Sequence, residues 1–124
     1  CAVVDQALSM LIRDLESRGK LDETLIVLAT EFGRTPRINQ NAGRDHYPKA
    51  FSCLMAGGGI KGGIAYGKTD DKGEEIIENR TSIQDFNATI AHALGIDGNE
   101  IIHSPSGRPF KMSNGGEFIK DLFV

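Results

Sequence analysis

The hydrophobic pattern at the start of the chain predicts an amphipathic helix over residues 2–17. Its apolar residues stand three or four positions apart, so one face of a helix carries all of them. These residues are Val4, Leu8, Leu11 and Leu15. Gly19 follows, and glycine readily takes the left-handed conformation that ends many helices.

Two continuous apolar runs predict strands that are buried on both faces. They are "TLIVLAT" (residues 24–30) and "AFSCLMA" (residues 50–56). A run without polar alternation is typical of a parallel sheet that helices cover on both sides. The glycines of "GGGIKGG" (residues 57–63) are expected to turn the chain after the second strand.

The second half of the chain predicts a hairpin and another helix. "KTDDKGEE" (residues 68–75) has the composition of a hairpin tip. In "TSIQDFNATIAHALG" (residues 81–95), Ser82 can cap a helix, with Asp85 three residues further on. The apolar stripe of this helix is Ile83, Phe86, Ile90 and Leu94.

The order helix, strand, loop, strand, hairpin, helix indicates an α/β fold. Two core strands make a thin sheet, and a sheet that is apolar on both faces needs a covering layer on each. The chain supplies about two helices for this purpose. It also begins at Cys1 rather than at a methionine. We therefore expect a piece of a larger domain, whose missing N-terminal part would hold any targeting signal.

Composition narrows the classes of function only a little. The chain has 124 residues, 40% hydrophobic and 25% charged, which is ordinary for one soluble domain or part of one. A net charge of −3 with scattered basic residues argues against nucleic-acid binding. No apolar run approaches the roughly 18 residues that a membrane span needs. Cys1 and Cys53 show no spacing typical of metal or redox sites.

The richest candidate chemistry lies between the two predicted strands. Glu31 directly follows the first apolar run, and His46 precedes the second. Ligands in open α/β sheets collect at the carboxyl ends of the strands. A carboxylate and a neutral imidazole are ligands that suit Zn²⁺ or Mn²⁺. A metal site is therefore one interpretation of this loop.

Two other interpretations of the loop stay open. Its arginines could hold a phosphate or sulfate in forked geometry. These arginines are Arg34, Arg37 and Arg44. Alternatively, the loop is solvent-exposed, Glu31 pairs with Arg34 or Arg44, and Asp45 caps a turn. The other two histidines, His92 on the second helix and His103 in a loop, are expected to be structural.

Taken together, several blocks resemble the C-terminal third of an exported bacterial sulfatase-like family of unknown function, within the alkaline phosphatase superfamily. The blocks are "VVDQALSMLIRDLESRGKLDETLIVLATEFGRTP", "GRDHYPKAFSCLMAGGGIKGGIAYGKTD", "SIQDFNATIAHALGID" and "SGRPFKMSNGGEFIKDLF", which cover nearly all 124 residues. The resemblance implies a three-layer α/β/α sandwich of the alkaline phosphatase-like type, of which residues 1–124 form a C-terminal part. It also implies an exported, periplasmic protein.

The resemblance assigns metal ligands residue by residue. The superfamily places an Asp-His or Asp-Asn pair, then Gly, after a core strand. Here "EFG" puts Glu31 at the acid position, but Phe32 replaces the second ligand. A later histidine of the superfamily matches His46, and Asp45 beside it is a reserve candidate. The implied metal is Zn or Mn before Ca, and the change at Phe32 is compatible with a single metal, an altered site or no metal at all.

The implied function is a metal-dependent hydrolase of sulfate or phosphate esters, with a small anionic ester as substrate. Arg34 or Arg44 would stabilise the charge that develops in the reaction. The superfamily nucleophile comes from strands nearer the N-terminus, so this segment alone is expected to be inactive. The alternatives are a non-catalytic binding or scaffold protein with a degraded metal site, and a phosphosugar mutase of the same superfamily. Exposed sheet edges would also favour a homo-oligomer.

Overall fold

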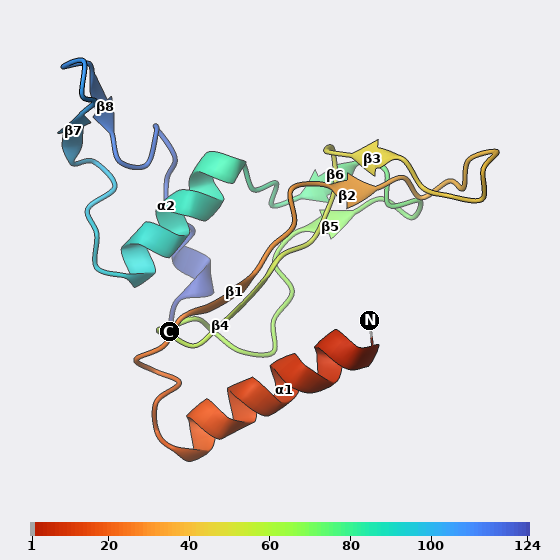
Figure 1. Cartoon of the computed structure of the whole chain (residues 1–124), viewed down its shortest axis with the longest axis horizontal. Coiled ribbons are helices and arrows are strands. Elements are labelled where there is room, and N and C mark those ends of the chain that lie inside the picture. The colour runs from red at the N-terminus through yellow and green to blue at the C-terminus, as the bar shows by residue number, and fades with distance from the viewer. Residues whose placement is uncertain (1) are drawn as a thin grey trace. The chain divides into compact units, whose positions relative to one another are not determined.

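The computed structural model describes residues 2–124, which form two α-helices, one short 3₁₀ helix and four pairs of short strands (Figure 1). The helices are α1 (Ala2–Ser17), α2 (Ile83–Ala93) and η1 (Lys120–Leu122). The strands are β1 (Ile26–Leu28), β2 (Gly33–Arg34), β3 (His46–Tyr47), β4 (Leu54–Ala56), β5 (Lys68–Thr69), β6 (Ile76–Glu78), β7 (Ile101–His103) and β8 (Pro109–Lys111).

Each sheet of the described chain contains two strands. The pairs are β1 with β4, β2 with β3, β5 with β6, and β7 with β8. The last three pairs are antiparallel. In the β2–β3 pair, Gly33 lies opposite Tyr47 and Arg34 lies opposite His46.

The expected α/β/α sandwich of the alkaline phosphatase-like type is wrong for residues 2–124. The two apolar runs do pair as β1 and β4, but each strand has only three residues and no third strand of the described chain joins them. Val27 and Leu28 are 37% and 43% exposed. A strand buried on both faces needs neighbouring strands and a layer on each side of the sheet. The hydrophobic run by itself does not supply these layers.

The described chain divides into two compact units, which are described separately. The first unit comprises the N-terminal segment up to Ile26, Met55–Gly62 and Ser82–Val124. It holds α1, α2, η1 and the β7–β8 hairpin. The second unit comprises Val27–Leu54 and Gly63–Thr81, and it holds the β2–β3 and β5–β6 pairs.

The two predicted helices of the first unit are confirmed, together with their ends. After α1, Gly19 takes a φ of 64°, its N–H donates to the carbonyl of Glu16, and the N–H of Lys20 donates to the carbonyl of Leu15. This is the hydrogen-bond pattern of a left-handed helix end. Ser82 caps α2: its Oγ accepts from the N–H of Asp85 at 3.0 Å.

The C-terminal tail is hydrogen-bonded to two parts of the first unit. The N–H of Ile119 donates to Oγ1 of the buried Thr89 on α2 at 3.0 Å. The N–H of Lys61 donates to the carbonyl of Leu122 at 2.7 Å. These bonds hold residues 116–124 beside α2 and the glycine-rich turn.

The β2–β3 pair of the second unit is tied to the β5–β6 hairpin. The hydroxyl of Tyr47 donates to the carbonyl of Glu74 at 2.7 Å. Within the hairpin, the N–H groups of Glu75 and Glu74 donate to Oδ1 of Asp70. These two bonds hold the pKa of Asp70 below its usual value.

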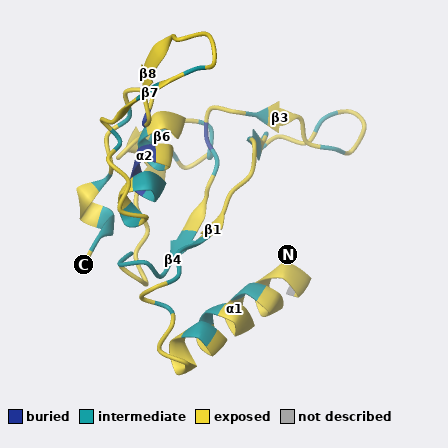
Figure 2. Cartoon of the chain, turned by 60° about the vertical axis from the view of Figure 1, so that its left-hand side comes forward, coloured by how far each residue is buried: buried dark blue, intermediate teal, exposed yellow. Residues whose placement is uncertain are grey.

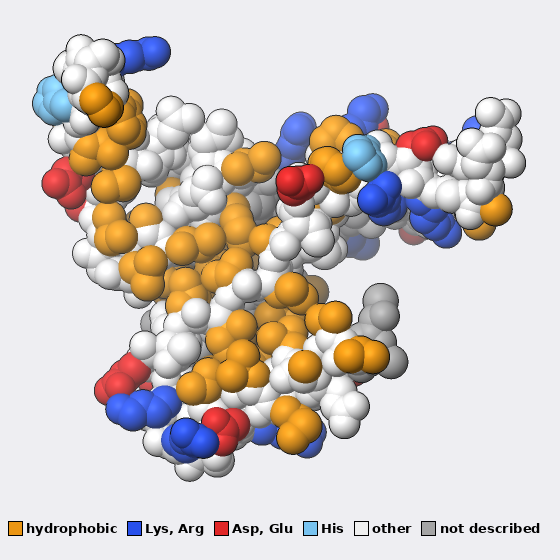
Figure 3. Space-filling view, in the orientation of Figure 1, with side chains coloured by type: hydrophobic (Ala, Val, Ile, Leu, Met, Phe, Trp, Pro, Cys, Tyr) orange, Lys and Arg blue, Asp and Glu red, His pale blue; other side chains and the backbone are white. Residues whose placement is uncertain are grey.

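Few side chains of the described residues are fully buried (Figure 2). The buried residues are Ala50, Ala88, Thr89 and Ser113. On α1, Val4 and Leu11 are 56% and 47% exposed, although they belong to the predicted apolar stripe. Hydrophobic side chains are visible on this helix in the space-filling view (Figure 3). The apolar pattern therefore predicts the helix correctly without being matched by a covering layer.

Candidate functional site

The β2–β3 pair brings an arginine, a histidine and a phenylalanine together on one face. Arg34 and His46 are cross-strand partners, and such partners project to the same side of a sheet. The ring of Phe32 stacks on the ring of His46, with centroids 3.9 Å apart and planes at 29°. The Cζ of Arg34 lies 5.8 Å from the centre of the Phe32 ring. We call these three residues the Arg34 face.

Backbone carbonyls orient both arginines that were predicted to act in the site. Nη1 of Arg34 donates to the carbonyl of Arg44 at 3.2 Å. Nη1 of Arg44 donates to the carbonyl of Thr35 at 2.8 Å and also to that of Pro36. Each guanidinium carries five N–H groups, so donors remain on both after these bonds.

These guanidinium groups have no carboxylate partner among residues 2–124. The ion pairs in this part of the chain involve other residues, and none joins Glu31 to Arg34 or Arg44. Both arginine side chains are exposed. The interpretation in which Glu31 neutralises them is therefore wrong, and they are available to an anion from solution.

Asp45 stabilises the loop that carries these groups. Its Oδ1 accepts a hydrogen bond of 2.8 Å from Nδ2 of Asn39. Oδ1 of the same asparagine accepts from the N–H groups of Asn41 and Gly43, each at 3.0 Å. The backbone of Asp45 bonds to Thr35 through both its N–H and its carbonyl. Asp45 thus has a structural role, close to the turn-capping role expected for it in an exposed loop.

The predicted metal ligands do not make a complete centre within the described residues. Among residues 2–124, no group of three or more His, Cys, Asp or Glu side chains could hold a metal ion. A catalytic zinc site normally has three protein ligands. Glu31 and His46 are exposed, and the His46 ring is stacked on a phenyl group. These residues fit a metal only if further ligands complete the site.

Sequence reasoning missed a cavity in the first unit. It has a volume of about 490 Å³ and lies beside α2, the turn at residues 96–99 and the C-terminal tail. His92, which was expected to be structural, lines it together with Phe118. No local signal marks this cavity, because residues 88–99 form it together with the C-terminal tail at residues 116–120, which is distant in sequence.

Comparison with known proteins gives one match. A family model described as "Protein of unknown function (DUF1501)" matches residues 1–123. No curated protein and no solved structure matches the chain. Within residues 2–124, no helix has both the length and the apolar character that crossing a membrane requires.

Proposed function

We propose that this chain, which belongs to the DUF1501 family of proteins of unknown function, serves the hydrolysis of sulfate or phosphate esters by binding their anionic group. The observation that carries the proposal is the Arg34 face, where an exposed guanidinium without a carboxylate partner among residues 2–124 lies opposite His46. The resemblance to sulfatase-like proteins of the alkaline phosphatase superfamily points in the same direction. The proposal rests on the residues of the loop and not on that superfamily's sandwich fold, because each sheet of residues 2–124 has two strands.

Arginine suits this role because of its fixed fork of N–H donors. A guanidinium can bind two oxygens of a sulfate or phosphate group at once, with charge-assisted hydrogen bonds. The carbonyl of Arg44 holds one Nη of Arg34 in place and leaves its other donors free. A donor set held in this way stabilises negative charge as it develops on the ester oxygens. Arg44, oriented by two carbonyls, would serve as the second donor.

Without a bound metal ion, His46 would supply proton transfer beside the arginines. Its imidazole is exposed and can donate or accept a proton, as release of the ester's leaving oxygen requires. Stacking on Phe32 restricts the ring to one orientation. The nucleophile is not assigned to any residue of this chain.

In the alternative with a divalent ion bound, His46 is a ligand rather than the group that transfers the proton. Glu31 and His46 would be two of the ligands, with Zn²⁺ or Mn²⁺ preferred over Ca²⁺ because one donor is an imidazole. Such an ion would polarise the ester oxygen when bound. Since residues 2–124 contain no group of three candidate ligands, other groups would have to complete the site.

A second candidate function is binding without catalysis. The stack of Phe32 on His46 favours it, because a phenyl ring occupies the place where the superfamily has a ligand and also covers one face of the imidazole. A protein with this arrangement could still hold an anion through Arg34 and Arg44. It would then act as a binding or scaffold protein.

Measurements of ester hydrolysis and of anion binding by the intact protein distinguish the hydrolase from the binding protein. We would measure cleavage of 4-nitrophenyl sulfate and 4-nitrophenyl phosphate with added Zn²⁺ or Mn²⁺ and with chelator. We expect Arg34→Met to lower kcat/KM by at least about tenfold, and Arg34→Lys to restore it only in part because the fork is lost. Arg13→Met, an equal charge change at an exposed position of α1, should have no effect.

The outcomes distinguish the two candidates clearly. Sulfate or phosphate binding that Arg34→Met weakens, with no cleavage of either ester, would establish the binding function instead of the hydrolase. Absence of both cleavage and anion binding would overturn the whole proposal. Metal content is measured in parallel: a bound ion that is lost in Glu31→Gln and in His46→Ala supports the ligand assignment, and a metal-free parent protein rejects it.

The proposal extends to self-association and to export. Val27, Leu28 and Leu54 of the β1–β4 pair are 37–43% exposed, and apolar strands with free edges tend to pair with other chains. If the protein does not self-associate, light scattering over a wide concentration range will show a single monomeric mass.

Export, inferred from the resemblance, is tested by fractionating cells that make the intact protein.

A further inference from the structure

The cavity beside α2 differs chemically from the Arg34 face. It lies entirely within the first unit, and its volume of about 490 Å³ falls in the range of sites for small organic molecules. Its charged lining consists of two carboxylates, Asp97 and Glu117, and one amine, Lys120. Two negative charges against one positive charge disfavour the anions that the Arg34 face would bind.

One wall of the cavity is aromatic. The ring of His92, in the last turn of α2, lies flat against the ring of Phe118, with centroids 3.8 Å apart and planes at 8°. The ring of Phe123 lies edge-on to the same imidazole, with ring centroids 4.9 Å apart. These contacts hold Phe118 in place although 42% of it remains exposed. The cavity therefore has an aromatic side made of packed rings.

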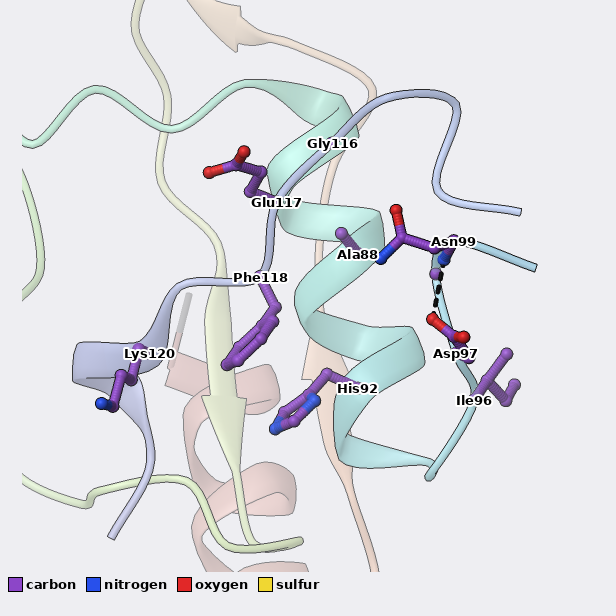
Figure 4. A pocket seen from close by; sticks show the side chains of 10 residues that line it. Ala88, His92, Ile96, Asp97, Asn99, Gly116, Glu117, Phe118 and Lys120 are labelled. Atoms are coloured by element: carbon purple, nitrogen blue, oxygen red, sulfur yellow. Dashed lines mark hydrogen bonds between the residues drawn. The ribbon is translucent and has the colours of Figure 1, made fainter. Parts of the chain in front are cut away.

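The other wall carries an amide and a carboxylate that are both held in position. Oδ1 of Asp97 accepts a hydrogen bond of 2.9 Å from the N–H of Asn99, drawn as a dashed line in Figure 4. Oδ1 of Asn99 accepts from Nζ of Lys111 at 3.3 Å. Oδ2 of Asp97 and Nδ2 of Asn99 have no hydrogen-bond partner among residues 2–124. The wall therefore offers one acceptor and one donor, two residues apart. In Figure 4 the side chains of Glu117 and Lys120 extend away from this turn.

A neighbouring donor and acceptor select the chemistry of the ligand. An ammonium group only donates and a sulfate or phosphate only accepts, so each can bond to only one of these two exposed side chains and leaves the other to water. A hydroxyl group does both, and two adjacent hydroxyls on a ring can bond to the acceptor and the donor together. The apolar C–H face of such a ring suits the wall formed by Phe118 and His92.

We infer that the cavity beside α2 binds a small neutral polyhydroxylated ring, of which a monosaccharide is the simplest example. The face of Phe118 that His92 does not cover contacts the apolar face of the ring, and Asp97 and Asn99 bond to its hydroxyls. Ala88 on α2 lies between the two walls and leaves room for the ring (Figure 4). The inference does not depend on the Arg34 face or on hydrolysis.

The test is a titration of the ¹⁵N-labelled intact protein with glucose, galactose and N-acetylglucosamine, followed by two-dimensional NMR. We expect saturable shifts in the amide signals of residues 88–99 and 116–120 with at least one of these probes. Asn99→Ala should raise Kd by about tenfold, the effect of losing one well-placed hydrogen bond. Asp97→Asn, which replaces an acceptor by a donor at the same position, should weaken binding similarly.

Asn87→Ala is the matched control, because Asn87 is an exposed asparagine of α2 that does not line the cavity. This variant should bind as the parent does. Unchanged amide signals outside the cavity in Asn99→Ala would show that the variant is folded. Absence of saturable shifts with all three probes would overturn the inference. Equal weakening in Asn87→Ala and Asn99→Ala, or binding of sulfate or methylammonium at the cavity as tight as that of the sugars, would do the same.

Discussion

The carboxylate of Asp85 joins the start of α2 to the C-terminal tail, since its Oδ1 accepts a hydrogen bond of 3.0 Å from the N–H of Glu117. Its other oxygen accepts from the N–H and the hydroxyl of Ser82, at 3.2 Å and 2.6 Å. One side chain therefore both completes the helix cap and holds the segment that lines the cavity. The helix start and the tail are expected to lose stability together.

Replacing Asp85 by alanine should lower the free energy of unfolding by about 1–2 kcal/mol, the usual cost of a lost helix cap, with a further loss from the tail contact. Ser82→Ala removes only the cap and should cost about 1 kcal/mol. Urea denaturation measures both. Asn87→Ala, at an exposed position of the same helix, is the control. A loss in Asp85→Ala no greater than in the control would contradict the dual role.

Acid should remove the contribution of Asp85. The hydroxyl of Ser82, together with the N–H of Glu117, holds the pKa of Asp85 below the ordinary value of 3.8. A carboxyl whose pKa is lower in the folded state stabilises the fold fully above the unfolded pKa, and this contribution is lost as the pH falls through the folded pKa. The stability difference between the parent and Asp85→Asn should therefore be constant near neutral pH and shrink below about pH 4. Urea midpoints measured across this range test the prediction, which a difference independent of pH would contradict.

Thr89→Val should destabilise the first unit more than Thr89→Ser. Thr89 is fully buried at 0% exposure, and its hydroxyl accepts from the N–H of Ile119 and donates to the carbonyl of Asp85. Valine keeps the shape but leaves the N–H of Ile119 without a partner, at a cost of about 1–3 kcal/mol, whereas the carbonyl of Asp85 keeps its backbone bond within α2. Serine keeps the hydroxyl and loses one methyl group, at about 1 kcal/mol. The opposite order in thermal unfolding would show that the methyl group matters more than the hydrogen bonds.

Gly57→Ala should destabilise the first unit, whereas Gly62→Ala should not. Gly57 has a φ of 73°, and a Cβ there would lie 2.2 Å from the carbonyl oxygen of Thr24. The conformation alone costs about 1–2 kcal/mol for a residue with a side chain, and the clash adds to this. A Cβ built on Gly62 would meet no atom of the described chain within 4 Å apart from its immediate neighbours in sequence. Equal unfolding free energies for the two variants would argue against this close approach.

Tyr47→Phe should loosen the β5–β6 hairpin. The hydroxyl of Tyr47 donates to the carbonyl of Glu74 at 2.7 Å, so its removal should cost about 1 kcal/mol. Amide hydrogen exchange of residues 70–76 should become faster. Tyr66→Phe, at a more exposed tyrosine, controls for the loss of a hydroxyl. Unchanged exchange in Tyr47→Phe would show that the bond does not hold the hairpin.

The helices could be predicted because their determinants are local. The apolar spacing of residues 2–17 and the left-handed Gly19 define α1, and the sequence expectation and the structure agree on its bounds. Ser82 and Asp85 define the start of α2 through a capping box. In each case the interacting residues lie within about four positions, where helical geometry determines which groups meet.

The strands and the candidate site depended on contacts that no local pattern specifies. "TLIVLAT" correctly predicts β1, but its partly exposed residues are not covered on both faces. Phe32 was expected only as a lost ligand, and the register of β2 with β3 instead places its ring on His46. Asp45 was weighed as a ligand, and its contact with Asn39 gives it a structural role.

The sequence by itself determined the two helices, their caps, the hairpin and the choice of residues 31–46 as the candidate site. The tertiary structure decided which distant residues meet. Arg34 lies opposite His46 in the candidate site, and Thr89 of α2 bonds to the tail at Ile119. The physical reason is that helical and turn contacts close over a few residues. A pairing between distant residues must also overcome loop-closure entropy, and its register depends on everything that packs around it.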